Sequence, residues 1–231
     1  MMTYKYDIHV HCKEGSHCGK GPARDIVRAY AKAGFTGIVL TDHYNELFAK
    51  SFESNRAYAE NQYNAYLIAK DEGEKCGVDV FFGFEFRYEV HDFLTYGVGK
   101  DFLLENDDLF SLSFPEYADR VHAAGGCIVQ AHPFRYVKNH PICIQVPFID
   151  AVEIYNGSHL PTTPYPPFYN DLAEHFAREM HLIGTAGSDT HDVNKTDGIP
   201  LRKAGMLFPE KLRDVHHMIS MIRSGSFEIW K

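Results

Sequence analysis

The stretch Gly37-Ile38-Val39-Leu40-Thr41-Asp42-His43 carries the pattern that decides the fold. Its first four residues form a short apolar run typical of a buried strand, and an acid and an imidazole follow at once. Similar runs of apolar, aromatic or β-branched residues occupy positions 6–11, 80–85, 93–98, 127–130, 151–155 and 181–185. The sequence therefore predicts seven short strands, several of which end in groups able to do chemistry.

Helical stretches separate these runs. We predict helices over residues 22–33, 54–76, 113–124, 167–180 and 210–224, and an extended segment over 227–230. Pro22 suits a first turn, Ser54 can cap a helix, and glycine follows each of the first three helices. Strands that alternate with helices are typical of a parallel sheet, either open or closed into a barrel.

The composition is that of an ordinary globular protein of 231 residues and 26.3 kDa. The formal charge is −8, from 23 Lys and Arg against 31 Asp and Glu, and an acidic protein binds long nucleic acid poorly. No apolar run reaches the roughly 18 residues of a membrane helix, and the first residues lack the apolar core of a signal peptide. We therefore expect one cytoplasmic domain over residues 1–231, with neither a membrane nor long nucleic acid as partner.

Histidine is the unusual component, with 14 residues. The five cysteines contain no C-x-x-C pair, so the sequence predicts neither a disulfide framework nor a zinc site built from thiolates. Cys12 and Cys18 lie among histidines, and contact between these sulfurs and a metal stays open. Cys127 lies in an apolar run and is expected in the core.

Metal-binding residue types gather where the predicted strands end. His9 and His11 close the first strand, and side chains two residues apart in a strand point to the same side. The ends of the other runs carry Asp42, His43, Glu85, Asp92, His132, Glu153, Asp189 and His191. Because the carboxyl ends of parallel strands form one face, these groups should meet there as a polynuclear site. Imidazole and carboxylate ligands suit Zn, Mn or Fe, and Glu85 could bridge two ions.

The ordered set of motifs resembles the polymerase and histidinol phosphatase (PHP) superfamily. The matching stretches are His9-Val10-His11, Ser16-His17, Thr41-Asp42-His43, Gly83-Phe84-Glu85, Ala131-His132-Pro133, Glu153-Ile154-Tyr155-Asn156 and Ser188-Asp189-Thr190-His191. They occur in the family's order from residue 6 to about residue 200. The resemblance implies a distorted (β/α)7 barrel with two or three divalent metal ions at its C-terminal face.

The resemblance also implies how the ligands are shared. The first ion would be held by His9, His11, Glu85 and Asp189, the second by Glu85, His132 and Asp92, and the third by His17, His43 and His191. Many relatives carry histidine where this chain has Asp92, and His91 stands one place early. Alternation along a strand sends these two side chains to opposite faces, so we expect Asp92 as the ligand and keep His91 as the alternative.

Other polar residues are expected to support the ligands or to contact the substrate. Asp42 and Glu153 are interpreted as groups that orient ligands. Arg135 and Arg202 are candidate phosphate contacts, because a guanidinium presents two donors to phosphate, and surface salt bridges are the alternative for both. His159 is a candidate proton donor to the leaving group, with a solvated loop histidine as the alternative.

The resemblance implies metal-dependent hydrolysis of a phosphoester by metal-bound hydroxide. The expected substrate is a small phosphomonoester, with histidinol phosphate as one family possibility, or a short nucleotide. One alternative is a metal hydrolase of the amidohydrolase type, which also begins with His-x-His but usually carries a bridging lysine. Another is a PHP module that binds metal without catalysis. The oligomeric state stays open.

Overall fold

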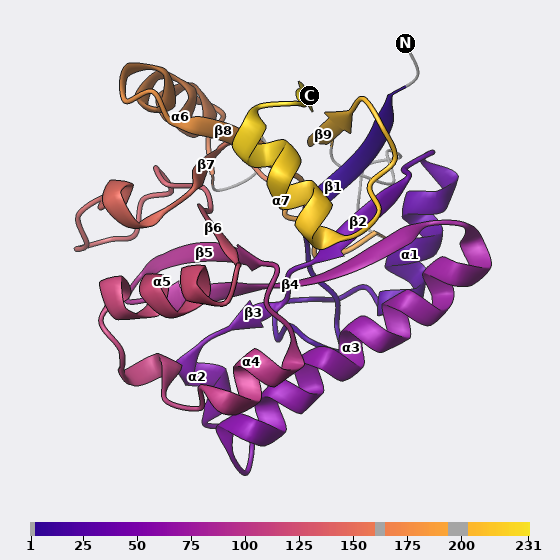
Figure 1. Ribbon diagram of the computed structural model, residues 1–231, viewed down its shortest axis with the longest axis horizontal. Coiled ribbons are helices and arrows are strands. Elements are labelled where there is room, and N and C mark those ends of the chain that lie inside the picture. The colour runs from indigo at the N-terminus through magenta and orange to yellow at the C-terminus, as the bar shows by residue number, and fades with distance from the viewer. Residues whose placement is uncertain (1–2, 160–164, 194–202) are drawn as a thin grey trace.

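Seven strands form a nearly closed ring in this protein, and helices cover the outside of the ring (Figure 1). The computed structural model describes residues 3–159, 165–193 and 203–231. The strands are β1 (Tyr4–Val10), β2 (Gly37–Leu40), β3 (His43–Tyr44), β4 (Asp79–Tyr88), β5 (His91–Tyr96), β6 (Cys127–Gln130), β7 (Ala151–Asn156), β8 (Ile183–Gly187), β9 (Gly205–Phe208) and β10 (Glu228–Trp230). The α-helices are α1 (Ala23–Lys32), α2 (Glu46–Ala49), α3 (Asn55–Cys76), α4 (Lys100–Glu105), α5 (Phe114–Ala123), α6 (Phe168–Glu179) and α7 (Val215–Ser224). Short 3₁₀ turns occupy η1 (Leu109–Ser111) and η2 (Val146–Phe148).

The ring runs in the order β1, β2, β4, β5, β6, β7 and β8. It closes at its carboxyl end, where Val10 forms a parallel bridge with Thr190 just after β8. The N–H of His11 donates to the carbonyl of Thr190, and the N–H of Asp189 donates to the carbonyl of His9, both at 2.9 Å. The distorted (β/α)7 barrel predicted from the sequence is therefore confirmed, and its closure joins the first and last strands of the ring.

The ring is not purely parallel, and on this point the sequence-based expectation was wrong. β5 runs antiparallel to both of its neighbours, β4 and β6. Only Glu89 and Val90 separate β4 from β5, and Glu89 adopts a φ of 55° in that turn. A connection this short makes a hairpin, because a parallel crossover needs a dozen or more residues. Outside the ring, β9 pairs antiparallel with β1, and β10 pairs antiparallel with β9.

Apolar residues fill the ring and the spaces beneath the helices. The interior core includes Tyr6, Val39 and Leu94 from the strands, together with Met218 and Ile222 from α7. A second core lies between β1, β2 and the helices α1 and α3, which lie along one flank of the molecule in Figure 1. A third core is rich in aromatic rings and lies between α5 and the β4–β5 hairpin. These cores hold the strand ends in place while leaving the carboxyl end of the ring polar.

Helix ends follow local capping. α3 begins where the Ser54 hydroxyl accepts the N–H of Ala57, and it ends before Gly77, whose φ is 72°. The helix predicted over 210–224 begins later, at Val215, because the Asp214 side chain accepts the N–H of His217. Similarly, β8 begins two residues later than predicted, since His181 adopts a φ of 54° in the turn after α6.

The short elements β3, α2, α4 and β9 were not predicted. In the part of the chain that the structure describes, no helix is long and apolar enough to cross a membrane.

Candidate metal centre

A bulge in β1 turns the first pair of histidines into the ring. The pairing of β1 with β2 shifts by one residue near the carboxyl end of β1. Ile8 packs in the interior core, and the next residue, His9, also faces inward, with its Nε2 atom 3.3 Å from Glu85 Oε1. Bulges commonly re-aim side chains next to functional sites. Both His9 and His11 thereby join the polar end of the ring.

Glu85 lies at the centre of the polar cluster and is completely buried. Its Oε1 atom lies 3.3 Å from His9 Nε2 and 3.2 Å from His132 Nε2. Its Oε2 atom lies 3.4 Å from His11 Nε2 and 2.7 Å from His43 Nδ1. Each carboxylate oxygen thus faces a different pair of imidazoles, as expected of a group that bridges two cations.

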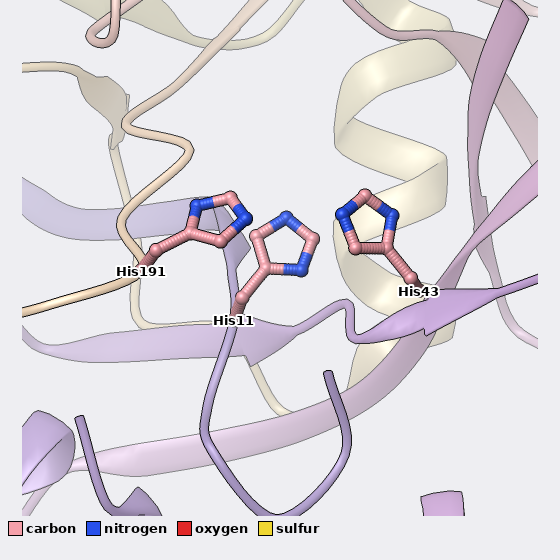
Figure 2. Close-up of side chains that lie close together, drawn as sticks. All are labelled: His11, His43 and His191. Atoms are coloured by element: carbon pink, nitrogen blue, oxygen red, sulfur yellow. The ribbon is translucent and has the colours of Figure 1, made fainter. Parts of the chain in front are cut away.

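Four groups of side chains place their possible ligand atoms within 4.8 Å of one another. The groups are His11 with His43 and His191, His9 with Glu85 and His132, His9 with His11 and Asp189, and His43 with Glu85 and Asp92. Figure 2 shows the first group, with the ring of His11 between those of His191 and His43. The structure therefore brings together every ligand predicted from the sequence except His17.

His17 lies outside these groups. Its side chain is exposed, and its ring centroid lies 4.8 Å from that of Phe48. The preceding residue explains this, because Ser16 is buried: its hydroxyl donates to Asp42 Oδ1 at 2.6 Å and accepts the N–H of His43 at 2.9 Å. Ser16, and not His17, therefore takes the buried position in this loop. The expectation that His17 joins His43 and His191 is not met in this structure.

Cys18 lies near His191 and His43, but it is exposed and belongs to none of the four groups. Burial opposes ionisation of this thiol, but the hydrogen bonds and charges of the two histidines lower its pKa to about 7. The position of Cys18 among histidines in the sequence indicated this proximity.

Supporting hydrogen bonds set the tautomers of the first two histidines. Nδ1 of His9 lies 2.8 Å from Glu153 Oε1, a carboxylate oxygen that can only accept. Nδ1 of His11 lies 3.2 Å from the Ser16 hydroxyl, whose own proton goes to Asp42. Both rings therefore carry a proton on Nδ1 and present Nε2 to the cluster. Glu153 and Asp42 have the orienting contacts predicted for them.

Burial and charge keep the acids of the cluster ionised. Burial alone would raise the pKa of Glu85, but the charges of His43 and His9 hold it well below its usual range. Burial likewise opposes ionisation of Asp189, and the charges of Arg135 and His9 keep its pKa well below its usual range. Burial disfavours charge on His9, yet the surrounding carboxylates raise its pKa well above its usual value. The cluster therefore favours a cation at this point, either a proton on His9 or a metal ion bound to it.

The cluster contains buried polar atoms that lack hydrogen bonds. Among the described residues these atoms are His9 Nε2, His11 Nε2, His43 Nδ1 and Glu85 Oε2. Each unsatisfied buried group costs about 1–3 kcal/mol, and all four converge on the same small volume. Divalent metal ions would satisfy them together. The donor set of imidazoles and carboxylates fits the Zn, Mn or Fe ions that the sequence implies.

Two candidate ligands are held in strained backbone conformations. His132 has a φ of 30° and Asp189 a φ of 54°, in a region that costs a non-glycine residue about 1–3 kcal/mol. Such strain is concentrated at functional sites, where the surrounding structure enforces it. Gly187 allows β8 to approach β1 here, because a Cβ atom on Gly187 would lie only 2.3 Å from His9 Cβ.

Asp92, and not His91, belongs to one of the ligand groups. Its Oδ2 atom lies 3.9 Å from His132 Nε2. Arg87 stands directly across the β4–β5 hairpin and binds both oxygens of Asp92, with Nε to Oδ1 at 2.8 Å and Nη2 to Oδ2 at 2.9 Å. We did not predict Arg87, because its position opposite Asp92 follows from the register of a hairpin that the sequence pattern did not indicate.

Arg135 and His159 lie together at the edge of the cluster. Nη2 of Arg135 donates to Asp189 Oδ2 at 2.7 Å and to the Ser158 hydroxyl at 2.8 Å. Its Nε atom lies 3.4 Å from His159 Nε2. His159 is only 3% exposed, and its Nδ1 lies 2.8 Å from Asn170 Oδ1. Both residues therefore occupy the region expected of substrate-contacting groups, whereas Arg202 falls outside the described residues.

No family model matches this sequence, and no curated protein matches it. Solved structures do match its fold. A two-domain protein from Bacteroides vulgatus, which contains a predicted PHP-like metal-dependent phosphoesterase, aligns at a TM-score of 0.71 and 16% identity, over 99% of this chain and 64% of that protein. The lesion-specific endonuclease EndoQ from Pyrococcus furiosus aligns at a TM-score of 0.59 and 14% identity, over 99% of this chain and 58% of the endonuclease. An amidohydrolase from Chromobacterium violaceum, with bound sulfate and no metal, aligns at a TM-score of 0.56 and 14% identity, over 96% of this chain and 97% of that protein.

These likenesses concern the fold. The chain shares the fold of PHP-like phosphoesterases, as the resemblance of its motifs implied. It spans less than two thirds of the length of the Bacteroides protein and of EndoQ.

Proposed function

We propose that this chain is a metal-dependent phosphoesterase that hydrolyses a small phosphomonoester or a short nucleotide. The arrangement around Glu85 carries the proposal, because each of its oxygens faces two imidazoles and three of the four neighbouring nitrogen atoms lack hydrogen bonds. The residues that would hold two to three ions are His9, His11, His43, Glu85, Asp92, His132, Asp189 and His191. Such ions, when bound, activate water at neutral pH and neutralise charge on a phosphoryl oxygen.

The roles of the remaining residues follow from their contacts. Glu153 and Ser16 keep protons on the Nδ1 atoms of His9 and His11, so that the Nε2 atoms stay available as ligands. Asp189 turns Oδ1 toward His9 and His11 and turns Oδ2 toward Arg135. Arg135 is thereby held beside the cluster, where its guanidinium would contact a phosphoryl oxygen of the substrate.

We assign His159 to the orientation of Arg135 and not to proton donation. Burial and the positive charge of Arg135 lower the pKa of His159 to about 4, so the ring is neutral at pH 7. In that form Nδ1–H donates to Asn170 Oδ1, and Nε2 accepts the Nε–H of Arg135. A neutral ring in this tautomer has no proton on the side that faces Arg135.

Two neighbouring folds define the competing functions. EndoQ is an endonuclease, so a phosphodiester is the second candidate substrate, although the charge of −8 disfavours long nucleic acid. The fold likeness to an amidohydrolase makes amide hydrolysis another candidate function. Against this, the ion-pair partners found for Glu85 among the described residues are four histidines, and the bridging lysine usual in that class is not among them.

A substrate panel on metal-reconstituted protein tests the proposal. Protein stripped with a chelator and reloaded with Zn²⁺, Mn²⁺ or Fe²⁺ is offered phosphomonoesters, nucleotides, a phosphodiester, a DNA oligonucleotide and an amide. We expect phosphomonoesters or nucleotides to be hydrolysed, with activity lost on chelation and restored by metal. Hydrolysis of the amide alone, or no hydrolysis of any phosphoester with any of the three ions, would contradict the proposal.

A further inference from the structure

A buried carboxylate that belongs to none of the ligand groups lies where β1 meets the segment that follows β8. The carboxylate is that of Asp7, which is fully buried. Its Oδ1 atom accepts the N–H of His9 at 3.1 Å and the N–H of Ser188 at 3.0 Å. Its Oδ2 atom accepts the hydroxyl proton of Tyr30, on α1, at 2.5 Å. One carboxylate oxygen therefore joins two segments that lie 181 residues apart in the chain.

Both N–H groups that bind this oxygen lie beside candidate ligands. His9 is itself a candidate ligand and lies in the bulge of β1, where the register with β2 shifts. An Asp side chain commonly accepts the N–H two residues further on, and here it takes up the N–H of the bulged residue. Ser188 directly precedes Asp189, whose φ is 54°. Asp7 thus contacts the backbone at the two places where the chain turns a ligand toward the cluster.

The ligand atoms next to these two places lie close together. Asp189 Oδ1 is 3.6 Å from His9 Nε2 and 3.5 Å from His11 Nε2. The three residues form one of the four ligand groups. Because two of them come from β1 and one from the segment after β8, the spacing of these two segments decides whether one ion can reach all three.

The ring closes through other hydrogen bonds as well. The N–H of Asp189 donates to the carbonyl of His9 at 2.9 Å. The N–H of His11 donates to the carbonyl of Thr190 at the same distance. Loss of the Asp7 carboxylate should therefore leave the ring closed and change how accurately the ligands are placed.

We propose that Asp7 is a positioning residue for the metal centre. Its Oδ1 atom holds the backbone of His9 and the backbone of Ser188 at one point. The spacing between the side chains of His9 and Asp189 depends on this contact, although Asp7 itself touches neither an ion nor the substrate. The inference rests on the metal centre of the proposed function, and its effect should fall on the ion shared by His9, His11 and Asp189.

Three substitutions separate the position of the oxygen from its charge. Asp7→Asn loses the charge but keeps an oxygen that can accept both N–H groups, while its amide can donate to the Tyr30 oxygen. Asp7→Ser keeps a hydroxyl for the nearby N–H of His9 but is too short to reach Ser188. Asp7→Glu keeps the charge and displaces the oxygens by one methylene group, and it takes the place of Asp7→Ser if that variant does not fold.

Cobalt binding tests the role of Asp7 without an activity assay. Full-length, metal-free protein is titrated with Co²⁺, bound cobalt is counted by elemental analysis, and the visible absorption of the bound ion reports its coordination geometry. We expect Asp7→Ser and Asp7→Glu to bind one ion at least about tenfold more weakly, with altered absorption, as is typical when a group that orients a ligand is lost. Asp7→Asn should keep the affinity and the absorption of the wild type.

Asp150 provides a matched control. It directly precedes β7, at the amino end of that strand and away from the polar cluster, and its Oδ2 atom accepts the N–H of Ile128 at 2.9 Å. Asp150→Ala should lower the stability of the metal-free protein in urea and leave cobalt binding unchanged. A general loss of stability would therefore not reproduce the effect expected at Asp7.

The possible failures are distinguishable. Wild-type affinity and absorption in Asp7→Ser and Asp7→Glu would overturn the role of Asp7 and leave the proposed function standing. Asp7→Asn that binds cobalt as weakly as Asp7→Ser would also overturn it, because the amide keeps the hydrogen bonds and loses only the charge. Equal weakening in Asp150→Ala would replace positioning by general destabilisation. Wild-type protein that binds no cobalt would overturn both the inference and the metal centre beneath it.

Discussion

Glu85 is the residue on which the proposed chemistry depends most. Its carboxylate is fully buried and touches the nitrogen atoms of four histidines, so a neutral amide in its place would direct N–H protons at nitrogen lone pairs. We predict that Glu85→Gln lowers phosphoester turnover by roughly 100-fold or more and reduces bound metal, because an amide bridges cations poorly. Steady-state kinetics and elemental analysis measure both effects. Glu179→Gln, at an exposed site on α6, is the control. Near-normal turnover in Glu85→Gln would contradict the assignment of Glu85 to the site.

His159 provides a pH test of the electrostatics. Its folded pKa of about 4 lies below the usual 6.5, so between these values the unfolded chain binds the proton and the folded chain does not. The resulting stabilisation is complete above pH 6.5 and is lost as the pH falls through 4. We predict that the stability of wild type relative to His159→Gln falls by about 3 kcal/mol from pH 7 to pH 4. Urea unfolding of metal-free protein over this range measures it, and a constant difference between the two proteins would contradict the assigned pKa.

Arg135 joins the metal cluster to the proposed phosphate contact. Lysine at this position keeps the charge but cannot donate to Asp189, Ser158 and a substrate oxygen in one plane. We predict that Arg135→Lys lowers kcat/KM about 10-fold or more while the metal content stays near that of the wild type. Kinetics and elemental analysis on the same preparation separate the two quantities, with Arg178→Lys on the exposed face of α6 as control. Unchanged kinetics would leave Arg135 with a structural role alone.

The residue types predicted most of the cluster, because histidines and acids at the ends of so many strands are best explained by metal binding. The outward position of His17 was not predictable in the same way. It depends on Ser16, whose three hydrogen-bonding contacts turn it inward, and no local propensity reveals those contacts. Arg87 was missed for a similar reason, since its partner Asp92 is a cross-strand neighbour and not a sequence motif.

At the scale of elements, the approach of β8 to β1 is the feature that shapes the site. Ala at Gly187 would place a methyl group 2.3 Å from His9 Cβ, so one strand must move. We predict that Gly187→Ala destabilises the fold by about 1–3 kcal/mol and weakens metal binding, as expected of overpacking beside a ligand. Denaturant unfolding with and without metal measures both. Gly99→Ala is the control, because a Cβ atom there meets nothing within 4 Å; equal stabilities of the two variants would refute the close approach.

The elements themselves show where sequence patterns succeed. The seven apolar runs all became ring strands, since a run of this length buried on both faces has little alternative. Strict alternation from Tyr6 would nevertheless have placed His9 outside the ring, and the β1 bulge reverses that outcome. The direction of β5 also escaped prediction, because it depends on a two-residue turn at Glu89 and Val90. Short elements such as α2 and β3 depend on tertiary contacts more than on propensity.

At the scale of the whole molecule, the closure of the ring gives the chain its candidate active face. The ligand residues extend from His9 to His191 in the sequence, and they meet only because the segment after β8 pairs with β1. The net negative charge of the chain agrees with a site that holds cations. Two or three divalent ions would change the formal charge from −8 to −4 or −2.

The central claim is that this ring end holds a polynuclear metal centre, and the metal content of the purified protein tests it most directly. Protein purified without chelator, supplied with Zn²⁺ and Mn²⁺ and dialysed, is analysed for total metal per chain beside Glu85→Gln. We predict at least two equivalents of metal in the wild type and fewer in the variant, because three buried nitrogen atoms around Glu85 and its own Oε2 atom form no hydrogen bond among the described residues. A wild type that holds one equivalent or none after this treatment would contradict the account.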